Sequence, residues 1–461
     1  MFGFRESKHM SARSSTAEHG AYISAVPGSN PGARTMRVLS NQLKDYIGQE
    51  VKLLGRLYGL RKMGGITFVI LQDRKGLAQM VFEQEIAAKV GSIISVSGLV
   101  KEEKRAPQGA ELAGKSLEVI QAPAEDLPFD LSKKELNVEM STLFDYRPLT
   151  LRHETVRSIF RVYDMAILAY TEAMRAMDFT EIKTPKILGA ASEGGANFFT
   201  IDYFGTRAFL AQSPQFYKQF GVGVFERVFE VGPVFRAERH FTSRHVNEYV
   251  SLDAEMAFIE SDEDVREALT QALKHIVQTV GERNQAELKL HSAELPLLPE
   301  KIPAVKLSEM REIIKKEYGY EIPKDTDIDP QGEVYAGRYA REKFNSDFIF
   351  LTHYPRGYRP FYIMPDDENP KETKSFDLIF KGVEIATGGQ RIHDYHKLME
   401  SIKLYRLKPD DFEFYLQAFK YAMPPHGGWG LGSERVVCKL LNLPSVKEAI
   451  LFPRDVKRLV P

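Results

Sequence analysis

The chain has 461 residues, of which 43% are hydrophobic and 27% charged, a composition that suits about two to four soluble globular domains. The 62 Lys and Arg balance the 63 Asp and Glu, so overall basicity is excluded as a means of binding nucleic acid. The single cysteine, Cys438, excludes an intramolecular disulfide and a cysteine cluster for zinc, and we expect a cytoplasmic setting. No apolar run has the length of a membrane-spanning helix.

Residues 1–35 differ from the rest of the chain. They are rich in Ser, Ala, Gly and His, show no hydrophobic periodicity and lack the apolar stretch of a secretory signal. We interpret them as a disordered tail, a mis-start or a fusion remnant, because folded patterning begins at Met36.

Residues 36–123 are predicted to form a small β domain. Turn residues such as Gly64 and Gly65 separate short β-rich runs, and a short helical run, Gln84–Val90, follows the third run. This is the layout of a five-stranded OB-fold barrel, which commonly binds single-stranded nucleic acid; another small β-barrel is the alternative. The expected strands are Val51–Leu57, Ile66–Leu71, Leu77–Phe82, Ile93–Val100 and Leu117–Ile120.

Residues 109–116 match the pattern GxxxxGK[ST] of a phosphate-binding loop. Such a loop works only between a strand and the start of a helix. Here a charged, loop-like stretch precedes the match, and the residues after Ser116 alternate like a strand. We therefore reject the motif and predict a hairpin loop of the barrel.

Residues 124–150 contain two prolines and mixed charge, which predicts a hinge. In residues 151–461, Val156–Met177 has helical periodicity, and Ser261 with Asp264 resembles a capping box before a second helix. Strand-like runs lie between the helices without strict alternation, which indicates an α+β domain with a largely antiparallel β-sheet flanked by helices. These runs are Val228–Val231, Tyr249–Met256, Phe348–Leu351, Phe376–Phe380 and Val383–Thr387.

Three segments place charged residues in apolar, strand-like surroundings. An arginine buried there needs an anionic partner, so Arg236 and Arg435 are candidates to hold a polyphosphate. Asp377 and Glu384 lie across an expected hairpin or strand bend, a spacing that suits Mg²⁺ bound to phosphates. Structural ion pairs remain the alternative for any one segment. The segments are 229–255, 376–391 and 427–435.

Together these segments resemble the class II aminoacyl-tRNA synthetases. Val228–Glu238 is similar to motif 2 of that class, Gly430–Arg435 to motif 3, and Phe179–Pro185 to motif 1, whose proline lies at the dimer interface. One match is weak, but three in this order are specific, and the resemblance covers essentially all of 36–461. It implies an ATP-dependent ligase, a homodimer, and an N-terminal barrel that binds the tRNA anticodon.

Within this class the chain resembles the aspartate enzymes. The stretch between motifs 2 and 3 is too short for the large extra domain of typical bacterial members, which implies the archaeal/eukaryotic-like form with a small insertion at about 287–345. The segments that carry the resemblance are Gln212–Gln219, Ser192–Gly195, Gly388–Asp394 and Pro424–Gly428.

The resemblance assigns roles residue by residue. Arg236 and Arg435 would be catalytic, because they neutralise phosphate charge while aspartate attacks ATP. The aspartate-binding residues would be Glu193, Gln215, Lys218, Arg236, Asp253 and Arg391. The ATP-binding residues would be Arg236, Glu238, Arg244, His245, Tyr249, Glu384, Gly432 and Arg435, and the Mg²⁺ ligands Asp377 and Glu384.

In the barrel, Phe68 and Gln79 match positions that the family uses on the anticodon: Phe68 would stack a base and Gln79 would hydrogen-bond one. Tyr58 and Pro107 correspond to the positions that separate members charging only tRNA-Asp from those that also charge tRNA-Asn. Pro107 favours the relaxed form, which needs a downstream amidotransferase, whereas Tyr58 matches neither pattern.

Three rivals remain. An asparagine–tRNA ligase shares the architecture, but Lys218 argues against it. A lysine–tRNA ligase is disfavoured because Lys218 and Arg391 would repel a cationic substrate. A synthetase-like paralogue with another acceptor is disfavoured by the retained barrel. His245 is a candidate phosphate contact, while His393 and His426 would serve equally well to order loops.

Overall fold

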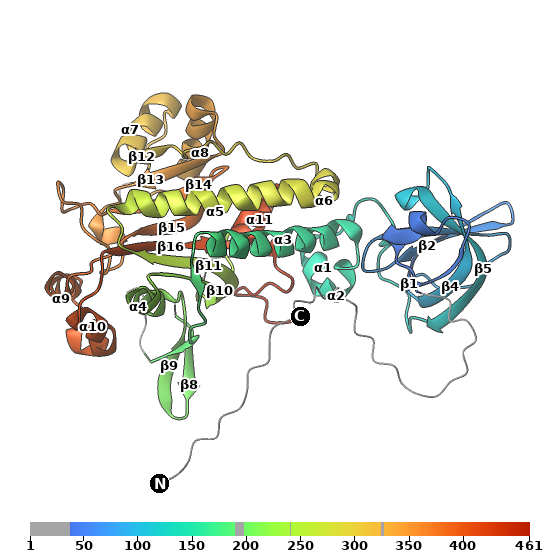
Figure 1. The fold of residues 1–461 in the computed structure, drawn as a ribbon, viewed down its shortest axis with the longest axis horizontal. Helices are drawn as coiled ribbons and strands as arrows, with labels where there is room; N and C mark the ends of the chain where they lie inside the picture. Colours follow the sequence, from blue (N-terminus) through green and yellow to red (C-terminus); the bar gives the residue numbers. More distant parts are fainter. Residues whose placement is uncertain (1–36, 190–197, 240, 324–326) are drawn as a thin grey trace, which may run out of the picture. The chain divides into compact units, whose positions relative to one another are not determined.

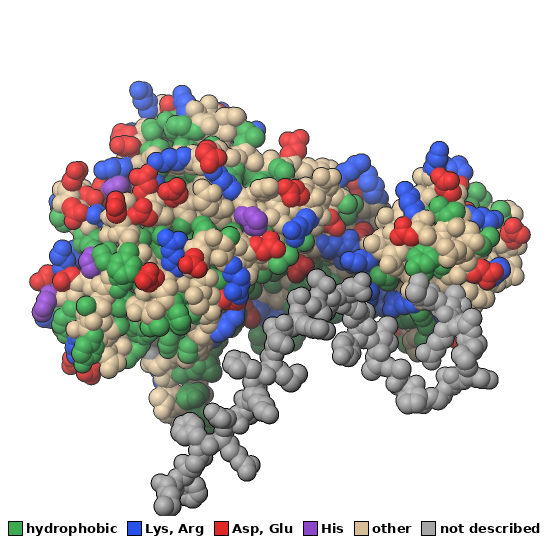
Figure 2. All heavy atoms as spheres, viewed as in Figure 1, with side chains coloured by type: hydrophobic (Ala, Val, Ile, Leu, Met, Phe, Trp, Pro, Cys, Tyr) green, Lys and Arg blue, Asp and Glu red, His purple; other side chains and the backbone are tan. Residues whose placement is uncertain are grey.

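The computed structural model describes residues 37–189, 198–239, 241–323 and 327–461. The chain divides into two compact units, Met1–Phe129 and Asp130–Pro461. No helix within the described ranges is long and apolar enough to cross a membrane. Acidic and basic side chains are interspersed over the face shown in Figure 2.

The first unit contains a closed five-stranded barrel with strand order β1-β2-β3-β5-β4 (Figure 1). All pairs are antiparallel except β3 with β5, which pair in parallel. Alternate residues of each strand fill the barrel core, as the pattern predicted. The strands are β1 (Glu50–Met63), β2 (Ile66–Gln72), β3 (Leu77–Phe82), β4 (Ile93–Glu102) and β5 (Ala110–Gln121).

Two local predictions in the barrel were wrong. Gln84–Val90 is not helical. Instead Thr67 Oγ1 donates to the carbonyl of Gln84 at 2.8 Å, and Ile86 packs into the barrel core; a helix this short has little stability of its own. The stretch that resembles a phosphate-binding loop is no hairpin loop either, because Ala110–Gln121 is one strand. It pairs with β4 through a register shift at Gly98.

The second unit contains an eight-stranded sheet of order β12-β13-β14-β15-β16-β11-β10-β6. The sheet is antiparallel except for two parallel pairs at its edges, β12–β13 and β10–β6. Its strands are β6 (Thr180–Glu181), β10 (Arg227–Phe235), β11 (Glu248–Ala257), β12 (Ala304–Lys306), β13 (Phe348–Thr352), β14 (Ser375–Phe380), β15 (Val383–Gln390) and β16 (His426–Gly432). A separate three-stranded sheet holds β7 (Ile187–Leu188), β8 (Thr200–Tyr203) and β9 (Thr206–Leu210).

Two long helices, α3 (Glu154–Ala176) and α5 (Asp262–Arg283), run side by side across one face of the large sheet (Figure 1). Ser261 caps α5 in the predicted capping box. The main core lies between this face, these helices and α11 (Ser433–Leu440), on which Cys438 is buried as expected. The other helices are α1 (Met140–Asp145), α2 (Arg147–Thr150), α4 (Gln215–Phe225), α6 (Gln285–Leu290), α7 (Leu307–Tyr318), α8 (Pro330–Phe344), α9 (Tyr395–Leu404) and α10 (Glu413–Lys420).

The alternation of β11 determines where charge can lie. Leu252, Ala254 and Met256 point into the main core, so the residues between them, Asp253 and Glu255, face the opposite side of the sheet. A smaller core joins α7 and α8, which lie in the predicted insertion, to residues of β13 and β14, which lie after it.

Candidate active site

The face of the sheet opposite α3 and α5 carries a cavity of about 380 Å³. Its lining brings together residues that lie far apart in the sequence. Of the fourteen residues assigned to amino acid, ATP or metal, thirteen line it; Glu193 lies outside the described residues. The thirteen are Gln215, Lys218, Arg236, Glu238, Arg244, His245, Tyr249, Asp253, Asp377, Glu384, Arg391, Gly432 and Arg435.

At one end of the cavity, two buried cations share two carboxylates. Lys218 Nζ lies 3.0 Å from Asp253 Oδ1 and 3.4 Å from Glu255 Oε2. Arg391 Nε donates to Glu255 Oε1 at 2.8 Å. Burial would raise the pKa of Glu255, but Arg391 and Lys218 outweigh it and lower the pKa. The two cations are therefore balanced by two carboxylates before any substrate binds.

Glycine in β16 makes room for this cluster. A Cβ at Gly428 would lie 2.1 Å from the carbonyl oxygen of Ala254 and 2.2 Å from Glu255 Oε2. The Gly428 carbonyl also accepts a hydrogen bond from Arg391 at 3.0 Å. Gly428 therefore serves the packing of β16 on β11.

A neutral histidine lies beneath the cations. His426 is fully buried; its Nδ1 lies 2.8 Å from the carbonyl of Pro424 and its Nε2 lies 2.8 Å from Gln219 Nε2. Burial lowers the pKa of His426 to about 4. The neutral tautomer with the proton on Nδ1 satisfies both contacts, because Nε2 then accepts from the amide.

The other end of the cavity carries two arginines. The guanidinium of Arg236 lies 5.7 Å from the centre of the Tyr249 ring. Arg435 donates to the main-chain carbonyl of Glu384 at 2.7 Å, and its side chain lies 3.7 Å from the Glu384 carboxylate. An arginine carries five N–H groups, and the contacts of Arg435 with Glu384 involve its Nη1.

The β14–β15 hairpin supplies the two predicted metal ligands. Asp377 pairs with Thr387 across the hairpin, and Glu384 follows the turn. Asp377 Oδ2 accepts from Arg359 at 2.7 Å, whereas Asp377 Oδ1 is buried and has no hydrogen-bond partner among the described residues. Burial would raise the pKa of Glu384, but Arg435, Arg236 and Arg359 lower it. The unpartnered oxygen of Asp377 and the charged carboxylate of Glu384 are oxygen ligands of the kind that a hard cation binds.

The loop between β10 and β11, residues 236–247, brings Arg244 and His245 to the same end. Arg244 forms an ion pair with Glu333 at the start of α8, and Glu333 also accepts from the main-chain N–H of Glu384 at 2.8 Å. Burial raises the pKa of Glu333 to about 7, although Arg244 opposes the shift. His245 Nδ1 lies 2.7 Å from Thr242 Oγ1.

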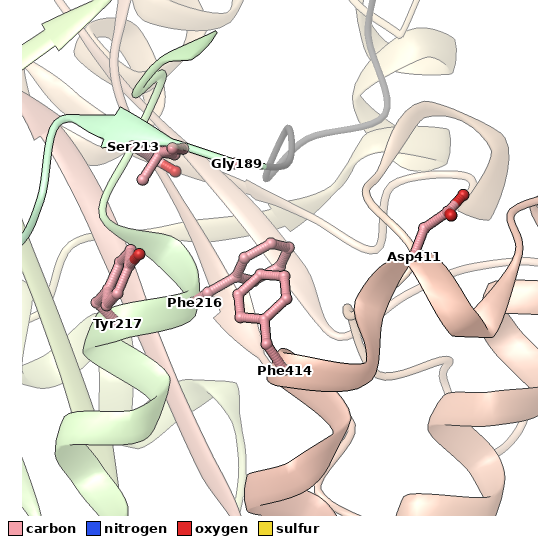
Figure 3. A pocket seen from close by; sticks show the side chains of 7 residues that line it. Gly189, Ser213, Phe216, Tyr217, Asp411 and Phe414 are labelled. Atoms are coloured by element: carbon pink, nitrogen blue, oxygen red, sulfur yellow. The ribbon is translucent and has the colours of Figure 1, made fainter. Parts of the chain in front are cut away.

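A second cavity, of about 280 Å³, lies beside α4. Figure 3 shows its aromatic wall, in which the rings of Phe216 and Phe414 meet edge to face at 5.7 Å. Of the residues given a role from the sequence, none lines it. The first cavity is therefore the candidate active site.

The comparisons agree with this geometry. Residues 139–456 match the family of class II tRNA synthetases (D, K and N). The aspartate–tRNA(Asp/Asn) ligase of Thermus thermophilus is 46% identical over 92% of this chain and 100% of its own length, and the aspartate–tRNA(Asp) ligase of Pyrococcus abyssi is 42% identical over 90% and 97%. The asparaginyl-tRNA synthetase structure of Pyrococcus horikoshii superposes with a TM-score of 0.84 at 30% identity, covering 90% of this chain and 97% of that one.

The chain belongs to the aspartate–tRNA ligases of class II.

Several residues of this synthetase site were given no role from the sequence. Glu255 and Glu333 are far in sequence from the arginines they bind, and Arg359 lies in a loop without a recognised motif. Glu434 is buried on α11 and accepts the main-chain N–H of Val250 at 3.0 Å; burial raises its pKa to about 7. For Glu255 on β11 and Glu434 on α11, the sequence offered one signal: each is a charged residue within an apolar stretch.

In the barrel of the synthetase, Phe68 and Gln79 lie on the outer faces of β2 and β3. The flanking residues Thr67 and Val69 are buried, and Gln79 pairs with Ile70, so both predicted contacts project from one surface. Gln79 donates to Glu111 at 2.9 Å. Tyr58 is only 6% exposed, and Pro107 begins the turn before β5.

Proposed function

We propose that the chain activates L-aspartate with ATP and transfers it to the 3′ end of tRNA-Asp and also of tRNA-Asn. One observation carries the proposal: the buried cations Lys218 and Arg391 occupy one end of a cavity whose other end holds Arg236 and Arg435. The first pair suits the side-chain carboxylate of aspartate and the second pair suits a triphosphate.

The reaction is a displacement followed by a transfer. An oxygen of the aspartate α-carboxylate attacks the α-phosphorus of ATP, the bond to the β-phosphate breaks, and pyrophosphate leaves. A ribose hydroxyl of the tRNA then attacks the carbonyl carbon of the adenylate, and AMP leaves. Arg236 stabilises the charge that develops on the α-phosphate, and Arg435 holds the γ-phosphate, so the protein acts by positioning and charge neutralisation.

Asp377 and Glu384 would hold Mg²⁺, which would supply neutralisation of the phosphate charge. Gln215 is assigned to the α-ammonium site by resemblance; its buried Nε2, which has no hydrogen-bond partner in the described chain, is a donor and would suit an oxygen of the substrate. Glu193 is assigned there only by resemblance.

Selection of the acid over the amide follows from charge. Asparagine would place a neutral amide between Lys218 and Arg391 and would lose a charge-assisted hydrogen bond. In a buried site this loss costs about 3 kcal/mol. The same charges disfavour asparagine and lysine as substrates of this chain.

The relaxed tRNA specificity rests on two supports. Relatives at 46% and 45% identity are named aspartate–tRNA(Asp/Asn) ligases, and Pro107 matches the relaxed pattern. A strictly tRNA-Asp-specific enzyme is the second candidate, because other relatives are named for tRNA(Asp) alone and Tyr58 matches neither pattern. The relaxed form requires an amidotransferase that converts Asp-tRNA-Asn.

We further propose a cytoplasmic homodimer that uses the motif 1 proline, Pro185.

The test is aminoacylation of purified tRNA-Asp and tRNA-Asn with aspartate or asparagine. We expect charging of both tRNAs with aspartate only. Charging by asparagine would refute the proposal, and failure on tRNA-Asn alone would leave the tRNA-Asp-specific enzyme. Lys218→Ala and Arg391→Ala should each lose aspartate-dependent pyrophosphate exchange, whereas Lys301→Ala, in an exposed ion pair, should retain it. Normal exchange in both pocket variants would overturn the aspartate assignment.

A further inference from the structure

The segment 445–458 follows α11 and lies against the ATP-binding loop 236–247. Val446 N–H donates to the carbonyl of Ser243 at 3.0 Å, and Asn247 N–H donates to the carbonyl of Arg454 at 2.8 Å. Val446 itself lines the active-site cavity. Two main-chain hydrogen bonds therefore join this segment to the part of the loop that carries Arg244 and His245.

A buried lysine reinforces this junction. Lys447 Nζ pairs with Asp455 Oδ2 at 2.6 Å, and both side chains are 5% exposed. The same ammonium lies 3.9 Å from the centre of the ring of Phe241, a residue of the loop, and Lys457 lies 4.5 Å from that ring. A cation over an aromatic face is attracted to the ring, more strongly when the cation is desolvated. Phe241 is thus held although 55% of it is exposed.

Asn247 passes this constraint to the catalytic arginine. Its side-chain amide donates to the carbonyls of Arg236 at 2.7 Å and Glu238 at 3.0 Å. The main chain of Asn247 also accepts from Arg236 N–H at 2.9 Å. The residue that Arg454 holds is therefore the residue that ties the two limbs of the loop together.

The segment has a fixed base on its other side. The guanidinium of Arg147, at the start of α2 and only 1% exposed, donates to three of its main-chain carbonyls. These belong to Glu448, Ile450 and Leu451, at 3.0, 2.7 and 2.7 Å. A segment anchored in this way can restrain the loop instead of moving with it.

We propose that segment 445–458 is a clamp that holds loop 236–247 in the conformation that receives the triphosphate, with Lys447 and Phe241 as its positioning residues. Neither residue touches substrate; each acts through the main chain of the loop. The inference rests on the proposed function for its identification of ATP, and it adds a determinant of ATP affinity outside the family's motifs.

The experiment measures pyrophosphate exchange in Lys447→Met, Phe241→Leu and the control Lys301→Met, which breaks an exposed pair with Glu263. We expect the KM for ATP to rise about tenfold in Lys447→Met and about threefold in Phe241→Leu, and both changes lie within the range of a cation–π contact. The KM for aspartate should stay unchanged in all three, because Lys218 and Arg391 make none of these contacts.

Hydrogen exchange of residues 241–247 without substrates provides a readout that does not depend on activity. Both clamp variants should exchange faster there than wild type, and the control should not. Unchanged hydrogen exchange of residues 241–247 together with an unchanged KM for ATP would overturn the clamp. An equal rise in the KM for aspartate would also overturn it. If Lys447→Met does not fold, Phe241→Leu decides, since its side chain is exposed. If wild type shows no aspartate-dependent exchange of pyrophosphate, the proposed function fails, and hydrogen exchange with ATP binding by calorimetry still judges the clamp.

Discussion

The carboxylate of Glu255 lies between Arg391 and Lys218 and is fully buried. Its charge allows two cations to occupy one end of a cavity before an anionic substrate arrives. Removal of one partner from such a cluster leaves an uncompensated charge, which costs more than the loss of an exposed pair. We therefore expect specificity for an acidic side chain to depend on a residue that faces away from solvent.

Glu255→Gln keeps the shape of the side chain and removes its charge. We expect the free energy of unfolding to fall by about 3 kcal/mol. Urea denaturation at about pH 7.5 measures the change in the free energy of unfolding. The control is Glu263→Gln, in an exposed pair with Lys301, which should cost less than about 1 kcal/mol. Equal losses in the two variants would refute the role of burial.

His426 makes stability depend on pH. Burial lowers its pKa from 6.5 to about 4, so the unfolded chain binds the proton first and folded stability falls as pH drops below 6.5. Between about pH 7 and pH 5 this one group should remove about 2 kcal/mol. In His426→Gln the loss over the same interval should be smaller by that amount. A wild-type slope in the variant, measured by denaturation at each pH, would contradict the assignment.

At the scale of the element, two hairpins present functional groups through strand alternation. In β14–β15, a register shift after Leu378 separates Asp377 from Glu384, and both line the same cavity. In β2–β3 of the barrel, Phe68 and Gln79 share the outer face while their neighbours fill the core. The period of two was readable from the sequence, but the register was decided by pairing.

Phe68→Ala removes the ring that we expect to stack on an anticodon base. The KM for tRNA-Asp in aminoacylation should rise about tenfold, because one stacked base contributes about 1–3 kcal/mol. Pyrophosphate exchange, which needs no tRNA, should be unaffected. Val119→Ala, an exposed apolar position on β5, is the matched control. An unchanged KM in Phe68→Ala would exclude this face as the anticodon contact.

At the scale of the whole molecule, the chain consists of two units with separate hydrophobic cores. The residues of the barrel core all come from the first unit, and the residues of the candidate active site all come from the second unit. Each unit therefore has what independent folding requires. The division falls at Phe129, inside the stretch that the sequence predicted as a hinge.

Residues 130–461 expressed alone should fold cooperatively and catalyse aspartate-dependent pyrophosphate exchange with the KM values of the full chain. Charging of tRNA should fall at least tenfold at the same tRNA concentration, because the barrel contacts are missing. Parallel exchange and aminoacylation assays on the two proteins give the comparison. An insoluble or inactive fragment would show that the second unit depends on the first.

The sequence by itself determined the elements and the kind of chemistry. Helical periodicity located α3 and α5, alternation located the main strands, and three ordered motifs with Lys218 identified the family and its substrate. Periodicity and alternation are local features of the sequence, and each motif is a set of residue types at a fixed spacing. The helix predicted at Gln84–Val90 does not form, because the side chain of Thr67 on β2 hydrogen-bonds the main chain of this stretch.

Only the tertiary structure decided which charges meet. Glu255 binds an arginine 136 residues away and Glu333 one that is 89 residues away, and neither separation leaves a periodic trace. The proposed clamp on loop 236–247 is equally non-local, because Lys447 and Phe241 are far apart in the sequence and their side chains meet in the folded chain. A buried charge must find a partner, but chain folding, and no local propensity, determines which partner is within reach.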